Sequence, residues 1–322
     1  DGARMTSRIP PVDLPLDRFP ASTIATDGAH VIEPDFEPRL AQVRLGVKYA
    51  VKDGRALHLH VLLPPGHQPH SQPVPVIVFV QGSAWFEQQH GHSLLPMATM
   101  AERGFAVVMV EYRPSSVAPF PAQIRDLNTA IAFIRANAAE WGCDADRLVL
   151  WGDSSGGHTV SLAGLTQGDK DFYDQTLDGD ASLDLTAHRA RGIACVVDYF
   201  GPVDIRRMNE EPSTMDHGRA DSPEGMLIGG RDLADSPELA EATVVTRYVD
   251  PESATPPFFI AHGTKDRLVP FGQSVLLWQA LKEAGHPAEF YRLEGADHAG
   301  DPFWAPTFLD VVESFIREHV AG

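Results

Sequence analysis

Residues 148–158 read L-V-L-W-G-D-S-S-G-G-H and decide the fold. The apolar run predicts a strand, residues 157–165 predict a helix of small residues, and the turn between them has the pattern G-x-S-x-G around Ser154. Such a sharp strand-to-helix turn holds its serine exposed in a strained backbone conformation. We predict Ser154 as a nucleophile, although an ordinary glycine-rich turn also matches the pattern.

Apolar strands and helices alternate on both sides of this turn. Strands are predicted at 74–80, 105–110, 147–151, 193–199, 257–261 and 288–293, and helices at 94–103, 121–141, 274–284 and 308–316. This alternation predicts a mostly parallel sheet with helices on both faces. A hairpin of 43–51 with 57–63 is predicted before it, because Asp53-Gly54 favours a tight turn.

The predicted organisation is an extended, proline-rich arm over residues 1–40 and one α/β domain over 41–322. Two stretches interrupt the alternation: the acidic residues 166–191, and residues 203–250, which are rich in Pro, Asp, Glu and Met. We interpret both as insertions on the side of the sheet that carries the turn. They form either surface decoration or a small lid over a substrate.

Composition argues against several classes of partner. A net charge of −18 disfavours nucleic acid and anionic membranes. No apolar run approaches the ~20 residues that span a bilayer. Residues 1–20 lack the apolar segment of a signal peptide, so a cytoplasmic location is expected. The two cysteines, Cys143 and Cys195, do not indicate a disulfide framework.

A serine hydroxyl becomes a nucleophile when a base lies within hydrogen-bond reach and a carboxylate orients that base. Asp266 follows the predicted strand 257–261, and His298 follows the strand 288–293. Catalytic groups in open α/β sheets gather at these carboxyl ends of the strands. We therefore predict Ser154, Asp266 and His298 as a catalytic triad. The less favoured candidates for the acid are Asp198, Asp204 and Asp297.

An oxyanion needs backbone N–H donors, one from the residue after the nucleophile and one from the loop after the third strand. Ser155 occupies the first position, and Gly82 and Ser83 are predicted to supply the second. Aromatic side chains that could form a wall of a substrate pocket, or could simply be packed, are Trp85, Phe86 and Trp304.

Metal or phosphate chemistry is not expected. His58 and His60 share a strand face, and His90 and His92 share a loop, but no third ligand follows at a recognisable spacing. The glycine-rich turn lacks the Gly-Lys-Ser/Thr of a phosphate-binding loop. We predict no metal and no cofactor.

Several motifs occur together in one known family. They are Q-G-S-A-W at 81–85, Tyr112-Arg113 followed by P-F-P-A at 119–122 and Asp126, G-D-S-S-G-G-H at 152–158, His262-Gly263 with Asp266 and Val269-Pro270, and the late His298. From about residue 74 to the C-terminus, the chain resembles the α/β-hydrolase esterases of the hormone-sensitive-lipase neighbourhood, most closely the bacterial deacetylases and feruloyl esterases.

The resemblance implies an α/β-hydrolase fold in which Ser154 is the nucleophile, Asp266 the acid and His298 the base. The chain departs from the family's H-G-G-G-W loop, since Gln81 replaces the histidine and Ser83-Ala84 replace two glycines. This substitution narrows the loop. The ester classes that the resemblance implies are acetylated sugars, hydroxycinnamate esters and short-chain aryl esters.

The sequence therefore predicts a serine esterase that acts on a small-molecule ester through an acyl-enzyme. One alternative is the same triad acting on amides, as in arylformamidases and serine peptidases. Such peptidases usually carry a propeller domain, for which residues 1–70 are too few. The other alternative is an inactive hydrolase fold that binds a ligand or partner. The sequence makes no prediction of oligomeric state.

Overall fold

The computed structural model describes residues 10–167, 169–174 and 192–321. The chain forms two units, Asp1–Glu37 and Pro38–Gly322. In the first unit the described residues are exposed and contain one short 3₁₀ helix, η1 (Leu16–Arg18). The second unit contains the sheet and all the candidate site residues.

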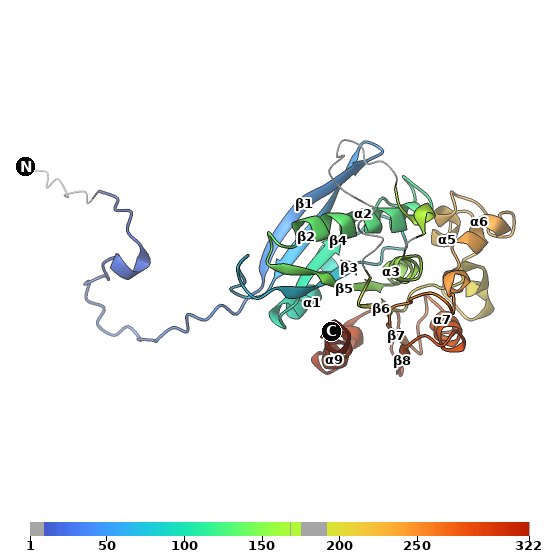
Figure 1. Ribbon diagram of the computed structural model, residues 1–322. Coiled ribbons are helices and arrows are strands. Elements are labelled where there is room, and N and C mark those ends of the chain that lie inside the picture. The colour runs from blue at the N-terminus through green and yellow to red at the C-terminus, as the bar shows by residue number, and fades with distance from the viewer. Residues whose placement is uncertain (1–9, 168, 175–191, 322) are drawn as a thin grey trace, which may run out of the picture. The chain divides into compact units, whose positions relative to one another are not determined.

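One eight-stranded sheet in the order β1-β2-β4-β3-β5-β6-β7-β8 forms the centre of the second unit (Figure 1). The pairs β1–β2 and β2–β4 are antiparallel, and every other pair is parallel. The predicted mostly parallel sheet is confirmed. The strands are β1 (Gln42–Lys52), β2 (Arg55–Leu63), β3 (Val74–Val80), β4 (Ala106–Val110), β5 (Cys143–Asp153), β6 (Cys195–Tyr199), β7 (Phe258–Gly263) and β8 (Ala288–Leu293).

Helices cover both faces of the sheet, as predicted. The helices α2 (Ala122–Asn137), α3 (Ser155–Leu165) and α7 (Gly272–Glu283) pack on one face, and α1 (Gly91–Glu102) and α9 (Pro306–Val320) on the other (Figure 1). Strand β3 is apolar throughout because its side chains alternate between the two cores, Val78 into one and Phe79 into the other. No helix of the described residues is long and apolar enough to cross a membrane.

The predicted hairpin is confirmed as β1 paired with β2. Asp53 and Gly54 have φ values of 51° and 71°, which gives the two left-handed residues of a tight hairpin turn. Strand β2 then pairs with β4 rather than with the next strand in the sequence. The long antiparallel ribbon thus extends the parallel sheet.

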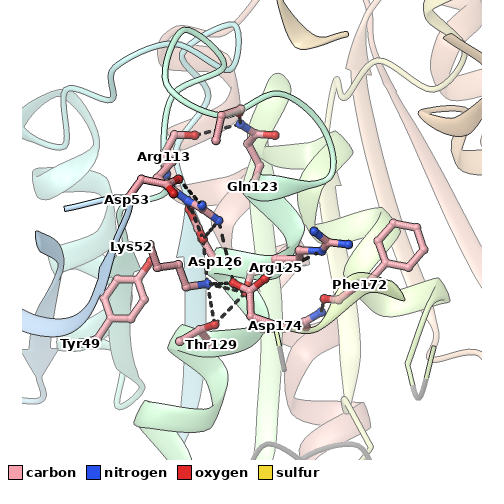
Figure 2. Close-up of polar contacts among 12 residues, drawn as sticks. Tyr49, Lys52, Asp53, Arg113, Gln123, Arg125, Asp126, Thr129, Phe172 and Asp174 are labelled. Atoms are coloured by element: carbon pink, nitrogen blue, oxygen red, sulfur yellow. Dashed lines mark hydrogen bonds and ion pairs between the residues drawn. The ribbon is translucent and has the colours of Figure 1, made fainter. Parts of the chain in front are cut away.

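A buried charge cluster ties this hairpin to α2 (Figure 2). Asp126 of α2 is fully buried and accepts a hydrogen bond from Lys52 Nζ at 2.9 Å. It also accepts from Arg113, through Nη2 at 2.7 Å and the backbone N–H at 2.8 Å. Lys52 pairs in addition with Asp174, and Arg113 with Asp53 at 2.7 Å. One carboxylate therefore joins β1, the loop after β4 and α2.

The insertion at 203–250 folds into short helices with their own small core. These are η3 (Ile205–Glu210), α5 (Pro223–Leu227), α6 (Pro237–Ala242) and η4 (Val245–Tyr248). The buried side chains of η3, α5 and α6 pack against Trp85, from the loop after β3, and Val269, from the loop after β7, whereas those of η4 join the main core. The insertion therefore lies at the carboxyl edge of the sheet. Of the predicted insertion at 166–191, residues 168 and 175–191 lie outside the described residues, and residues 170–172 form η2 (Lys170–Phe172).

Candidate active site

The turn between β5 and α3 holds Ser154 in a strained conformation, with φ 52° and ψ −125°. The flanking glycines let the strand and the helix approach each other closely, because a side chain at either position would collide with the backbone. A Cβ on Gly156 would lie 1.9 Å from the carbonyl oxygen of Val80, and a Cβ on Gly152 would lie 2.3 Å from the carbonyl oxygen of Gly156. The pattern G-x-S-x-G thus lets strand and helix meet around one presented serine.

Three loops that are distant in sequence bring Ser154, Asp266 and His298 together. His298 Nε2 lies 3.0 Å from Ser154 Oγ, and His298 Nδ1 lies 2.7 Å from Asp266 Oδ2. An ionised carboxylate has no proton to donate, so Nδ1 carries the hydrogen and Nε2 is left as an acceptor. The Phe200 ring packs against the imidazole, with the ring centroids 4.7 Å apart. This geometry can draw a proton from the serine hydroxyl.

Asp266 is held in its ionised form. Its Oδ1 accepts the N–H groups of Leu268 and Val269, both at 2.8 Å, and its Oδ2 lies 3.1 Å from His262 Nε2. Burial acts to raise the pKa of Asp266, but the hydrogen bonds from His262 and His298 outweigh it and hold the pKa well below its usual range. His262 is quoted in the sequence motif, but its contact with Asp266 emerges only in the structure.

The less favoured acids lie elsewhere. Asp297 accepts the backbone N–H groups of Arg267 at 3.0 Å and of His298 at 2.8 Å, and so joins the two loops. Asp198 accepts a backbone N–H from the loop after β6, and Asp204 pairs with a neighbouring arginine. In the described part of the chain, none of these carboxylates has a hydrogen bond to the His298 ring.

The backbone donors predicted from the loop after β3 are already engaged. The Gly82 N–H donates to Asp153 Oδ1 at 2.7 Å, and the Ser83 N–H donates to Ser155 Oγ at 3.0 Å. Burial raises the pKa of Asp153 to about 6, against the hydrogen bond from Gly82. These contacts fix the loop against the serine turn.

The backbone N–H groups of Ser155 and Ala84 differ from those of Gly82 and Ser83, which already donate hydrogen bonds. Ser155 is the first residue of α3, where a backbone N–H has no partner inside the helix. Ala84 lines a small cavity together with Ser154 and Ser155, and no hydrogen bond of the described residues uses its N–H. Its backbone is left-handed, with φ 55°, at a position where the glycine-rich pattern would place a glycine. The sequence analysis chose Gly82 and Ser83 over Ala84 in this loop, because residue type does not reveal which backbone N–H is left without an acceptor.

This cavity has a volume of about 60 Å³ and borders Ser154. Trp85 lines it, whereas Phe86 and Trp304 are not among its lining residues. Trp304 instead stacks on Trp151, with the ring centroids 5.7 Å apart, in the core on the other face of the sheet. The remaining lining residues come from the loops after β6 and β7 and from the insertion; they are Pro202, Met215, His217, Pro223, Glu224, Leu268 and Val269.

The histidines considered for a metal lie apart from this site. His58, His60 and His90 line a cleft of about 460 Å³ with Glu111. The Gly46 N–H donates to His60 Nδ1 at 3.0 Å, which occupies that nitrogen. Within residues 10–167, 169–174 and 192–321, no group of three or more His, Cys, Asp or Glu side chains is arranged to hold a metal ion.

His158 lies in α3 and links this helix to the loop after β3 and to the insertion. Its Nδ1 accepts from Trp85 Nε1 at 3.2 Å, so its Nε2 carries the hydrogen that is donated to the Thr243 carbonyl at 2.9 Å. Burial lowers the pKa of His158 to about 4. The neutral imidazole thereby joins α3, the loop after β3 and the insertion.

We expect His158 to make the folded state sensitive to acid. Between pH 6.5 and 4 the unfolded chain binds a proton that the folded chain excludes, so stability falls as pH falls, by up to about 3 kcal/mol. Urea unfolding of wild type and His158→Gln at pH 7 and pH 4.5 measures this term. Glutamine can accept and donate hydrogen bonds in the same places without titrating. Between pH 7 and pH 4.5 the variant should therefore lose less stability than wild type. Equal losses would show that His158 does not contribute.

Comparison with known proteins agrees with the fold and geometry. The BD-FAE family model matches residues 59–281. Esterase LipQ of Mycobacterium tuberculosis is 31% identical over 229 residues, which cover 70% of this chain and 50% of that protein. The structure of a truncated carbohydrate esterase from gut microbiota is 29% identical with a TM-score of 0.75, covering 89% of this chain and 100% of that one.

A bifunctional GH43-CE protein of Bacteroides eggerthii is 34% identical with a TM-score of 0.71, covering 86% of this chain and 38% of that one. The chain spans about half the length of the curated relatives that it matches. The family match, by contrast, covers most of the chain, from β2 to α7. The protein therefore belongs to the BD-FAE family of α/β-hydrolase esterases.

Proposed function

We propose that this protein is a serine carboxylic ester hydrolase that acts on small esters through an acyl-enzyme at Ser154. The observation that carries the proposal is the continuous hydrogen-bonded chain from Ser154 Oγ through His298 to Asp266, with distances of 3.0 and 2.7 Å. The cytoplasmic location expected from the sequence stays a prediction.

In the first half of the reaction, Ser154 Oγ attacks the ester carbonyl while His298 Nε2 takes the hydroxyl proton. Asp266 stabilises the imidazolium that forms. The N–H groups of Ser155 and Ala84 face the developing oxyanion, assisted by the positive end of the α3 dipole. His298 then returns the proton to the leaving alcohol. Water, activated by the same histidine, releases the acid from the enzyme.

Cavity size favours short acyl groups among the ester classes expected from the sequence. The space beside Ser154 is about 60 Å³, enough for roughly four water-sized groups. An acetyl methyl group fits this space, and so do other short acyl chains of alkyl or aryl esters. A hydroxycinnamoyl group, with a phenyl ring beyond its double bond, is much larger than an acetyl group and has to extend out of this cavity.

Hydrolysis of p-nitrophenyl acetate and methyl ferulate, together with labelling by a fluorophosphonate, tests the proposal. We expect covalent labelling of Ser154 and a higher kcat/KM for the acetate, after each value is divided by the ester's rate constant with hydroxide. A matched p-nitroanilide of acetic acid should react far more slowly than the ester. A folded protein that neither labels nor hydrolyses an ester would refute the esterase proposal.

A further inference from the structure

The insertion contributes a buried carboxylate to the cavity beside Ser154. Glu224, the second residue of α5, is 3% exposed and lines this cavity. Its Oε1 contacts His217 Nδ1 at 2.9 Å, whereas its Oε2 is buried and has no hydrogen-bond partner among the described residues. A buried acceptor without a partner is costly, so a ligand that donates a hydrogen bond to it is favoured.

Glu224 is held in place through its histidine partner. His217 Nε2 lies 2.8 Å from Ser213 Oγ, which in turn lies 3.0 Å from the carbonyl oxygen of Leu268. The N–H of Leu268 donates to Asp266 Oδ1. The carboxylate of the insertion is therefore connected, through three hydrogen bonds, to the loop that carries the triad acid. Its position relative to Ser154 is defined by these contacts.

The cavity lies on the acyl side of the site. His298 returns its proton to the leaving alcohol, so the alcohol part of an ester must lie beside the His298 ring. Ser154, Ser155 and Ala84 line the cavity, and His298 is not among its lining residues. An acyl chain attached to Ser154, with its carbonyl oxygen toward the Ser155 N–H, is thereby directed into the cavity that contains Glu224.

We propose that Glu224 is a specificity-determining residue that selects short 2-hydroxyacyl esters, such as glycolyl and lactoyl esters. The acyl hydroxyl donates to Oε2, and the few heavy atoms beyond the carbonyl fit within about 60 Å³. The negative charge of Glu224 disfavours acyl groups that end in a carboxylate. This inference rests on the proposed esterase function and names the acyl class for it.

Three ethyl esters test the selectivity with the wild-type chain. Ethyl glycolate and ethyl propionate differ by a hydroxyl in place of a methyl group, and ethyl methoxyacetate keeps the oxygen but cannot donate. Each kcat/KM is divided by the rate constant of the ester with hydroxide, which removes differences in intrinsic reactivity. We expect the glycolate value to exceed the other two by about tenfold. Equal normalised values would overturn the inference without any variant.

Glu224→Gln tests the residue itself. With its amide oxygen toward His217, glutamine presents an NH₂ donor in place of the acceptor. We expect the ratio of glycolate to methoxyacetate to collapse to within about threefold of one, because methoxyacetate can accept from that donor. Glu238→Gln is the matched control, since Glu238 is an exposed carboxylate of the same insertion that does not line the cavity, and the ratio should be preserved. Active sites are counted by fluorophosphonate labelling before each assay.

The outcomes separate this inference from the proposed function. A ratio that Glu224→Gln leaves unchanged overturns the role of Glu224, while hydrolysis of all three esters still supports the esterase. Absence of both hydrolysis and Ser154 labelling in a folded wild type overturns both. If Glu224→Gln does not fold, the wild-type comparison of the three esters still decides whether 2-hydroxyacyl groups are selected.

Discussion

Ser154→Ala is expected to lower kcat for p-nitrophenyl acetate by about a millionfold, while KM changes little. Ser154 supplies the only protein atom that bonds to the acyl group in the proposed mechanism, and alanine leaves His298 with no hydroxyl to deprotonate. The cavity and the Ser155 N–H remain, so the substrate can still bind. Stopped-flow and steady-state hydrolysis, with active-site labelling, measure the change.

Ser115→Ala provides the matched control for this substitution. The Ser115 hydroxyl is buried and has no hydrogen-bond partner among the described residues. Its removal should leave labelling and turnover close to those of wild type. If Ser154→Ala retained substantial turnover or a covalent fluorophosphonate label, another nucleophile would have to be sought.

Asp126→Ala is expected to lower the free energy of unfolding by about 3–5 kcal/mol. The substitution removes the carboxylate that neutralises both Lys52 and Arg113 inside the cluster of Figure 2, and it leaves these cations buried with fewer partners. The proximity of Asp126 contributes to a raised pKa of Arg113, although burial alone acts to lower it. Urea unfolding monitored by tryptophan fluorescence measures the loss.

Asp53→Asn is the matched control, because it also removes an anionic partner of Arg113 but at the surface, and asparagine tolerates the left-handed backbone of this residue, with φ 51°. The Asp53 side chain is 59% exposed, so its ion pair is screened by water and should contribute less than about 1 kcal/mol. A loss for Asp126→Ala no greater than that for Asp53→Asn would show that burial of the cluster does not govern its contribution.

The sequence alone predicted the elements whose local signals are strong. Strand β3 is apolar at every position, and Asp53-Gly54 has the conformational preferences of a tight turn, so both could be placed without tertiary information. Boundaries were less accurate: helix α2 ends at Asn137 rather than at 141, because the chain turns over residues 138–142 although Ala138 and Trp141 are still buried in the core. The pairing of β2 with β4 was not predicted, since no local signal specifies which strand is a neighbour.

The candidate triad was proposed from position in the chain. The serine lies in a strained turn, and the acid and the histidine follow later strands. Once these strands are parallel and adjacent, the three side chains lie near one another at the same edge of the sheet. Asp266 and His298 follow β7 and β8, which pair directly, so their loops must emerge side by side. The structure brings both residues within hydrogen-bond distance of each other.

The donors and the pocket were decided by tertiary structure. Whether a backbone N–H is free depends on which acceptor lies opposite it, and Asp153 and Ser155 engage Gly82 and Ser83 through contacts more than 70 positions apart. Trp304 resembles a pocket residue in sequence, but its ring packs on Trp151 in a core.

The sequence by itself determined the α/β architecture, the serine turn and the order of the candidate catalytic residues, because periodicity, glycine spacing and chain order are local properties. Only the tertiary structure decided that the insertion places Glu224 beside Ser154 and that Asp126 neutralises two buried cations. Hydrogen bonding and burial depend on groups that meet across the folded chain, and no stretch of sequence contains both partners.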